Sequence, residues 1–151
     1  MPALRKIWPI TFALFCASYP AYISDNMLQN LSEEEALRLR EKEQLVLDKK
    51  KEYDDAKSAY FLAKQELEQY KREVPSVKEE KKLLELEEKE AVYAQTLKLR
   101  QQEFMLVLAE LEEYKAKLLA TRMPFDTKPY EEQRREEQNR LEKLKKKQQE
   151  K

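Results

Sequence analysis

Apolar side chains recur at a seven-residue spacing between residues 32 and 122. In the first half they occupy every seventh position, and many positions three residues further on hold alanine or lysine. In the second half, apolar residues alternate at spacings of three and four. This pattern is typical of two long helices that pack along a narrow seam. The predicted seam residues are Leu39, Val46, Tyr53, Tyr60, Leu67, Leu83, Leu86, Tyr93, Leu97, Phe104, Val107 and Leu111.

Capping signals indicate where the two helices begin. A serine followed three residues later by a glutamate occurs at Ser32 and again at Ser76, and in such a pair each side chain bonds the other residue's backbone N–H. Pro75 disfavours helical geometry at the residue before it. We therefore expect a first helix over residues 32–74, a second over residues 75–122, and a turn at Pro75.

Folding back at Pro75 makes the two helices an antiparallel hairpin with a definite register. That register brings Tyr53 opposite Leu97, and it places Lys49 opposite Arg100 in a weak layer of like charges. The alternative is one kinked rod of about 90 residues, about 135 Å long, which pairs with a second chain. We favour the hairpin because large seam residues then lie opposite small ones.

An uncharged stretch, residues 7–23, precedes the charged helices. As a helix it spans about 25 Å, near the lower limit for crossing a bilayer. Aromatic residues near its ends are typical of membrane-interface anchors. We predict a membrane anchor over residues 1–24, followed by a linker over residues 25–31. The expected anchor residues are Trp8, Phe12, Leu14, Phe15, Tyr19 and Tyr22.

The same stretch also fits a cleavable secretory signal. Arg5 and Lys6 precede it, and small residues stand at Cys16 and Ser18, as before a cleavage site. If the segment is retained, the two basic residues place the amino terminus on the cytoplasmic or matrix side. The long helices then lie on the opposite face of the membrane.

Two short segments follow the predicted hairpin. Residues 123–130 contain two prolines and form a predicted loop. Its candidate docking residues are Met123, Phe125 and Tyr130, and a plain linker is the alternative. Residues 131–151 have almost no apolar stripe, so we expect a charged, solvated tail helix.

Composition favours an all-α chain. Charged residues make up 40% of the 151 residues, and glycine is absent, so tight turns and a compact sheet are not expected. The 30 basic and 30 acidic residues cancel, which argues against a nucleic-acid partner. The expected fold is all-α, with one short N-terminal transmembrane helix, a long antiparallel coiled-coil hairpin and a charged C-terminal helix.

Composition also limits the chemistry of the chain. Histidine is absent and there is one cysteine, so neither a Ser-His-Asp nor a Cys-His arrangement can form, nor an internal disulfide. Without glycine, the common phosphate-binding loops are excluded. We expect no catalytic residues, cofactor, metal or small-molecule substrate. The expected partners are the lipid bilayer and other protein subunits.

The opening Arg5-Lys6-Ile7-Trp8-Pro9, with its aromatic apolar continuation, is similar to small single-span subunits of mitochondrial ATP synthase. The long charged helices resemble the peripheral stalk of that complex. The resemblance implies a non-catalytic structural subunit of ATP synthase or a related respiratory complex in the mitochondrial inner membrane. Two other function classes remain open: a secreted or periplasmic coiled-coil binding protein, and a membrane-anchored assembly factor or tether.

Overall fold

The computed structural model describes residues 20–73 and 80–150, and all regular structure in these ranges is helical. The elements are the short 3-10 helix η1 (Asp25–Met27) and the helices α2 (Glu33–Glu73), α3 (Glu80–Ala120) and α4 (Lys128–Gln149). Helices α2 and α3 have 41 residues each, which is about 60 Å at 1.5 Å per residue. The all-α prediction is confirmed.

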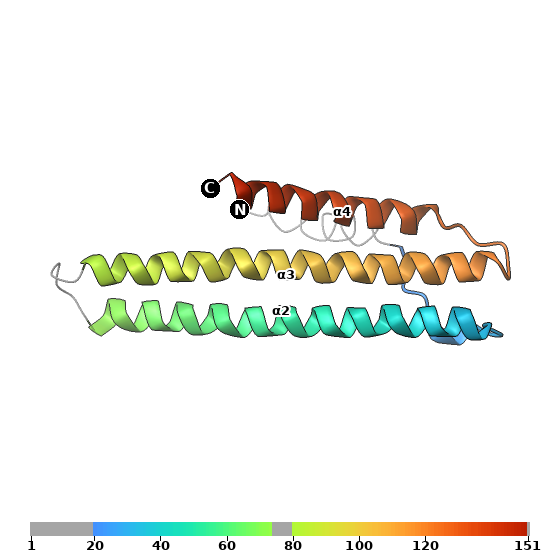
Figure 1. Ribbon diagram of the computed structural model, residues 1–151, viewed down its shortest axis with the longest axis horizontal. Helices are drawn as coiled ribbons and strands as arrows, with labels where there is room; N and C mark the ends of the chain where they lie inside the picture. Colours follow the sequence, from blue (N-terminus) through green and yellow to red (C-terminus); the bar gives the residue numbers. More distant parts are fainter. Residues whose placement is uncertain (1–19, 74–79, 151) are drawn as a thin grey trace, which may run out of the picture.

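The three long helices lie side by side in one layer, with α3 in the middle (Figure 1). Helix α3 packs against both α2 and α4, whereas α2 and α4 have no comparable packing with each other. Eight residues of α3 are buried, against four of α2 and three of α4. The core of the molecule is therefore arranged around α3.

Helix α2 begins at the predicted capping signal. The backbone N–H of Ser32 donates to Glu35 Oε2 at 2.9 Å, and the N–H of Glu35 donates to Ser32 Oγ at 3.2 Å. These bonds satisfy two backbone donors that a helix start otherwise leaves free. Acidic residues in the first turn, Glu33 and Glu34 among them, also interact favourably with the helix dipole.

Helices α2 and α3 are antiparallel, as the hairpin prediction requires. Glu35 near the start of α2 pairs with Arg122, just beyond the end of α3, at 2.5 Å. Lys71 near the end of α2 pairs with Glu87 near the start of α3 at 2.8 Å. The two helices therefore run in opposite directions along their whole length (Figure 1).

The contacts between α2 and α3 are displaced by a few residues from the predicted register. The ring of Tyr53 stacks on that of Phe104, with the centroids 6.0 Å apart, whereas the predicted register set Tyr53 opposite Leu97. Two helices can slide along each other and keep the same faces in contact, so the apolar spacing alone does not determine how far they slide.

Lys49 and Arg100 share one layer, as predicted, but two carboxylates also belong to it. Arg100 Nη1 lies 3.0 Å from Glu52 Oε2 and 2.8 Å from Glu103 Oε2. Lys49 Nζ lies 2.9 Å from Glu52 Oε2 and 3.7 Å from Glu103 Oε2. The observed register places two carboxylates between the two cations, so the layer is a neutral network that joins the helices.

The connection between α2 and α3 comprises residues 74–79. The predicted turn at Pro75 and the second capping signal, at Ser76, lie outside the described residues. Within the described residues, the second helix begins at Glu80 and ends at Ala120.

The tail helix begins earlier than predicted and is not solvated throughout. Helix α4 starts at Lys128, and Pro129 lies in its first turn. Proline fits there because the backbone N–H groups of the first turn have no acceptor within the helix. Its buried residues Tyr130, Glu137 and Leu141 lie on one side that packs against α3. The tail prediction was wrong because one of these buried residues is a hydrogen-bonded glutamate, so no apolar stripe marks the face.

Candidate functional site

Residues 20–28, here called the strap, cross α3 near its C-terminal end on their way to α2 (Figure 1). Ile23 of the strap is 2% exposed. It belongs to an apolar cluster that joins the strap to α3 and α4. The cluster comprises Ile23, Leu28, Ala116, Leu119, Phe125 and Tyr130.

Two hydrogen bonds hold the backbone of the strap. The N–H of Ile23 donates to Glu112 Oε2 on α3 at 2.9 Å. The hydroxyl of Tyr130 on α4 donates to the carbonyl oxygen of Ala21 at 2.6 Å. The strap is therefore bound by both helices, because one side chain of α3 and one side chain of α4 form hydrogen bonds with its backbone.

A buried lysine lies beneath the strap. The side chain of Lys115 is 2% exposed, and its Nζ donates to Asp25 Oδ1 at 2.7 Å. Nζ also lies 5.1 Å from the ring centroid of Tyr22. Burial disfavours the charged form of Lys115, but the hydrogen bond and charge of Asp25 outweigh burial and raise the pKa of Lys115.

Glu112 is the buried carboxylate beside this lysine. Its side chain is 14% exposed, and Oε1 lies 3.9 Å from Lys115 Nζ. Oε1 is buried and has no hydrogen-bond partner. Burial raises the pKa of Glu112, although the N–H of Ile23 and the charge of Lys115 oppose that rise.

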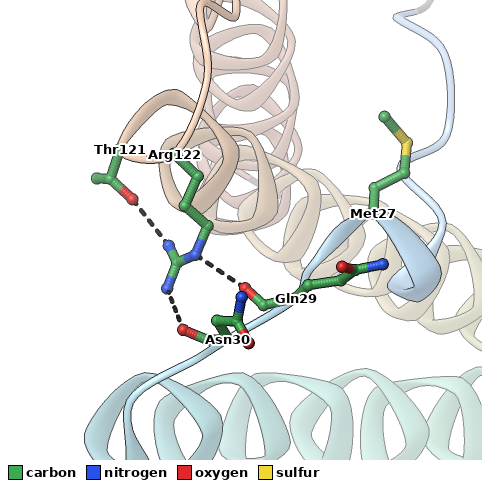
Figure 2. Close-up of a pocket in the computed structure, with 5 residues that line it drawn as sticks. All are labelled: Met27, Gln29, Asn30, Thr121 and Arg122. Atoms are coloured by element: carbon green, nitrogen blue, oxygen red, sulfur yellow. Dashed lines mark hydrogen bonds between the residues drawn. The ribbon is translucent and has the colours of Figure 1, made fainter.

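Arg122 fixes the segment that follows the strap. Figure 2 shows its guanidinium donating to the carbonyl oxygens of Gln29 and Asn30 and to the hydroxyl of Thr121. Further bonds go to the Leu118 carbonyl and to Glu35. The cavity of about 550 Å³ at this point is lined by Met27, Gln29, Asn30, Thr121 and Arg122. Because these bonds use all five guanidinium donors, Arg122 has none left for a ligand.

A second cavity, of about 300 Å³, has a lining of charged residues that bond one another. Glu113 accepts from Lys117 Nζ and from Arg134 Nε, each at 2.5 Å. Burial opposes ionisation of Glu113, but these two cations outweigh burial and lower its pKa. The lining comprises Lys42, Glu110, Glu113, Tyr114, Lys117 and Arg134. These paired charges join α3 to α4.

A buried carboxylate also links the middle of α3 to α4. Glu137 is 1% exposed. Gln102 Nε2 donates to Glu137 Oε2 at 2.5 Å and to its carbonyl oxygen at 3.1 Å, and Arg140 Nη1 donates to Oε1 at 2.9 Å. Both carboxylate oxygens of Glu137 are therefore satisfied, unlike those of Glu112.

The predicted seam residues lie on α2 and α3. All twelve are buried or partly buried, and the most buried are Leu39, Leu67, Leu86 and Leu111. Ala56 and Ala63, at intervening positions, are also buried. Small and large side chains therefore alternate along the seam.

The predicted docking residues contact the chain's own strap. Tyr130 and Phe125 have ring centroids 5.8 Å apart, and both belong to the cluster around Ile23. Met123 is 47% exposed. Two of the three predicted residues thus bind a segment of this chain.

Most of the predicted membrane anchor cannot be compared with the structure. Trp8, Phe12, Leu14, Phe15 and Tyr19 lie outside the described residues. Tyr22 is 71% exposed beside Lys115. Within residues 20–73 and 80–150, no helix combines the length and apolarity that crossing a membrane requires.

Sequence reasoning missed the charged residues at the strap. Asp25, Glu112, Lys115 and Arg122 lie among many similar residues, and no local spacing singles them out. One signal was present: residues 104–119 are apolar on more faces than a two-helix seam needs. That excess predicts a second partner for α3, which the structure supplies as α4 and the strap.

The described residues contain no group of three or more acidic, cysteine or histidine residues that could hold a metal ion. No protein-family model, curated protein or solved structure matches this chain.

Proposed function

We propose that this chain is a non-catalytic structural subunit, a helical brace that holds neighbouring subunits of a membrane-associated complex. The observation that supports the proposal is the open flank of α2. Helix α3 is covered on two sides, whereas α2 packs on α3 alone among the described helices. Large apolar side chains remain exposed along α2: Leu37, Leu45, Leu47, Phe61 and Leu62.

Part of this exposed set forms one surface. Leu47 and Phe61 are two heptads apart, so they lie on the same face of α2, and Leu62 adjoins them. They are 60%, 52% and 66% exposed. A neighbouring helix that covered them would gain about 25 cal/mol for each Å² of apolar surface removed from water. We propose that a partner subunit binds here.

Attachment to the membrane is the part of the proposal that depends on residues 7–20. Ala21 is bonded to α4, and Ile23, at the end of the uncharged stretch, is buried against α3 and α4. The uncharged residues before Ala21 number 14, about 21 Å as a helix, which is shorter than a typical hydrocarbon core of about 30 Å. Placement in a mitochondrial respiratory complex is supported by the resemblance of residues 5–9 and of the long charged helices to ATP synthase subunits.

The burial of Ile23 favours a second candidate, an exported coiled-coil binding protein whose leader is removed. The 14 uncharged residues before Ala21 fit the core of a secretory signal, which has about 7 to 15 residues. The folded part of the chain then begins close behind the cleavage site. In this candidate the binding surface on α2 is the same, but the protein acts outside the cell or in the periplasm.

Intact mass and native electrophoresis of detergent-solubilised membranes test both candidates. A full-length chain that migrates in a large complex supports the membrane-associated brace. A shortened, soluble chain supports the exported protein. A full-length chain that migrates alone contradicts both.

Paired substitutions on α2 test the binding surface. We expect Phe61→Ser with Leu62→Ser to release the chain from its complex. The matched control, Lys64→Ser with Gln65→Ser, places two serines on the next exposed positions and should leave the complex intact. Equal behaviour of the two double variants contradicts the assignment of this surface.

A further inference from the structure

The strap is held to the bundle by few contacts. They are the bonds from Glu112, Lys115 and Tyr130 and the packing of Ile23 and Leu28. The packing of α3 against α2 and α4 also involves residues far from the strap, such as Tyr53 with Phe104 and Gln102 with Glu137. Local opening of such a segment costs less free energy than global unfolding.

The closed strap brings three ionisable side chains together, of which Glu112 and Lys115 are 14% and 2% exposed and Asp25 is 66% exposed. Asp25 and Glu112 are acidic and Lys115 is basic, so the group carries a net negative charge when all three are ionised. Lys115 Nζ is 2.7 Å from Asp25 but 3.9 Å from Glu112. The one cation therefore bonds Asp25, and the buried oxygen of Glu112 remains without a hydrogen bond.

We propose that the strap is a pH-dependent switch, which closes on α3 and α4 when Glu112 takes up a proton and opens as Glu112 ionises. A protonated Glu112 still accepts from the N–H of Ile23 through Oε2. It no longer buries a charge on the unbonded oxygen. In the open state the carboxylate is hydrated, so ionisation carries no such cost.

The groups that face Glu112 act in known directions. Asp25, on the strap, adds a second negative charge and favours the protonated form, whereas Lys115, on α3, favours the ionised form. Burial and the charge of Glu112 raise the pKa of Tyr130 on α4, so its hydroxyl is neutral near neutral pH. The balance of these groups and burial raises the pKa of Glu112 in the closed state.

The sign of the pH dependence follows from this difference between the closed and open states. The closed state binds the proton more tightly, so closing is most favourable below the ordinary pKa range of a glutamate. The advantage is lost as the pH rises through the raised pKa. Between the two pKa values, the ratio of closed to open strap falls about tenfold for each pH unit.

Amide hydrogen exchange of the full-length chain tests the switch. The readout is the protection factor of a peptide that contains Ile23, corrected for intrinsic exchange, at several values from pH 5 to 8. We expect protection to fall severalfold from pH 5 to pH 8. Peptides from the centre of α2 should show no such change, because their protection does not depend on the strap.

Glu112→Gln should abolish the pH dependence. Glutamine keeps an oxygen that accepts from the N–H of Ile23, so the strap should remain as protected at pH 8 as the wild-type strap at pH 5. The matched control, Glu88→Gln, makes the same change at an exposed position of α3 and should retain the wild-type profile. A Glu112→Gln chain that retains the wild-type profile overturns the proposal.

Two other results also overturn it, neither of which requires a folded Glu112→Gln variant. One is wild-type protection that is constant, or that rises, from pH 5 to pH 8. The other comes from Ile23→Ala, which removes the buried side chain of the strap. That variant should lose protection in the strap at every pH while the α2 peptides remain protected, and a parallel loss in α2 contradicts separate opening.

Discussion

The two ends of the hairpin are stabilised in different ways. Near residues 74–79 two helices meet along a narrow apolar seam, flanked by exposed ion pairs such as Lys89 with Glu66. Near the strap, α3 contacts α2, α4 and the strap at once, and charged side chains such as Lys115 and Glu113 are buried. One end is therefore a simple coiled coil, and the other is a small multi-element core with bonded charges inside.

This difference shows what a third partner requires of a helix. A helix with one partner keeps its charges in water, where an ion pair contributes about 0 to 1 kcal/mol. A helix with partners on two sides must bury polar groups, and each of these then needs a bond. At the strap end, α3 meets this requirement for Lys115 and leaves Glu112 half satisfied.

The largest expected contrast concerns the register of the coiled-coil end. With Cys16 replaced by serine, Tyr53→Cys with Phe104→Cys should cross-link within one chain under mild oxidation, because the two rings stack. Tyr53→Cys with Leu83→Cys should not, since the Lys71–Glu87 pair places the start of α3 beside the far end of α2. Efficient cross-linking of the second pair, measured by mobility on a non-reducing gel, contradicts the observed register.

Removal of an aromatic ring should lower the free energy of unfolding more at the strap end than at the coiled-coil end. Tyr130 is 6% exposed, and Tyr130→Ala should lower the free energy of unfolding by about 3 kcal/mol through lost burial and a cavity. Tyr60→Ala, in the two-helix seam, removes a half-buried ring and should cost about 1 kcal/mol. Urea denaturation measures both, and equal losses contradict the idea that the strap end is the better-packed core.

Helix caps give a smaller contrast. Ser32→Ala removes the oxygen that accepts a hydrogen bond from the N–H of Glu35. It should lower the free energy of unfolding by about 1 kcal/mol. Thr127, at the start of α4, makes no side-chain bond to the helix backbone. Thr127→Ala should therefore change the urea midpoint less, and a larger effect there contradicts the assigned caps.

The smallest effect is expected in the charged layer in the middle of the contact between α2 and α3. Glu103→Gln removes a carboxylate shared by Lys49 and Arg100 and should lower the free energy of unfolding by about 0.5 kcal/mol. The loss should disappear in about 1 M salt, which screens partly exposed charges. A loss that persists in high salt indicates that packing, and not charge, is affected.

The sequence predicts the coiled-coil end better than the strap end. Apolar spacing identifies the faces of α2 and α3, and the Ser32 signal marks a true helix start. The exact register was missed because a slide of one helix along the other preserves those faces, and the stacking of Tyr53 on Phe104 is not encoded in the spacing. The register is set by contacts between side chains far apart in the chain, which the apolar periodicity does not specify.

The strap end could not be predicted in the same way, because its contacts join residues far apart in the chain. Asp25 and Lys115 are ordinary charged residues until the fold brings them together. Tyr130 was recognised as a docking residue, but its partner was placed on another molecule or on the membrane surface. When tertiary structure buries a polar residue, the hydrophobic periodicity of the sequence does not indicate it.

The separation of the strap's partners along the chain has a consequence for synthesis. The Ile23 to Glu112 and Ala21 to Tyr130 bonds span 89 and 109 residues. A ribosome that adds about 5 to 20 residues per second makes the second partner roughly 5 to 20 s after the first. During that interval the strap has no binding site, so residues 1–19 reach any targeting factor before the bundle can tie down the segment that follows them.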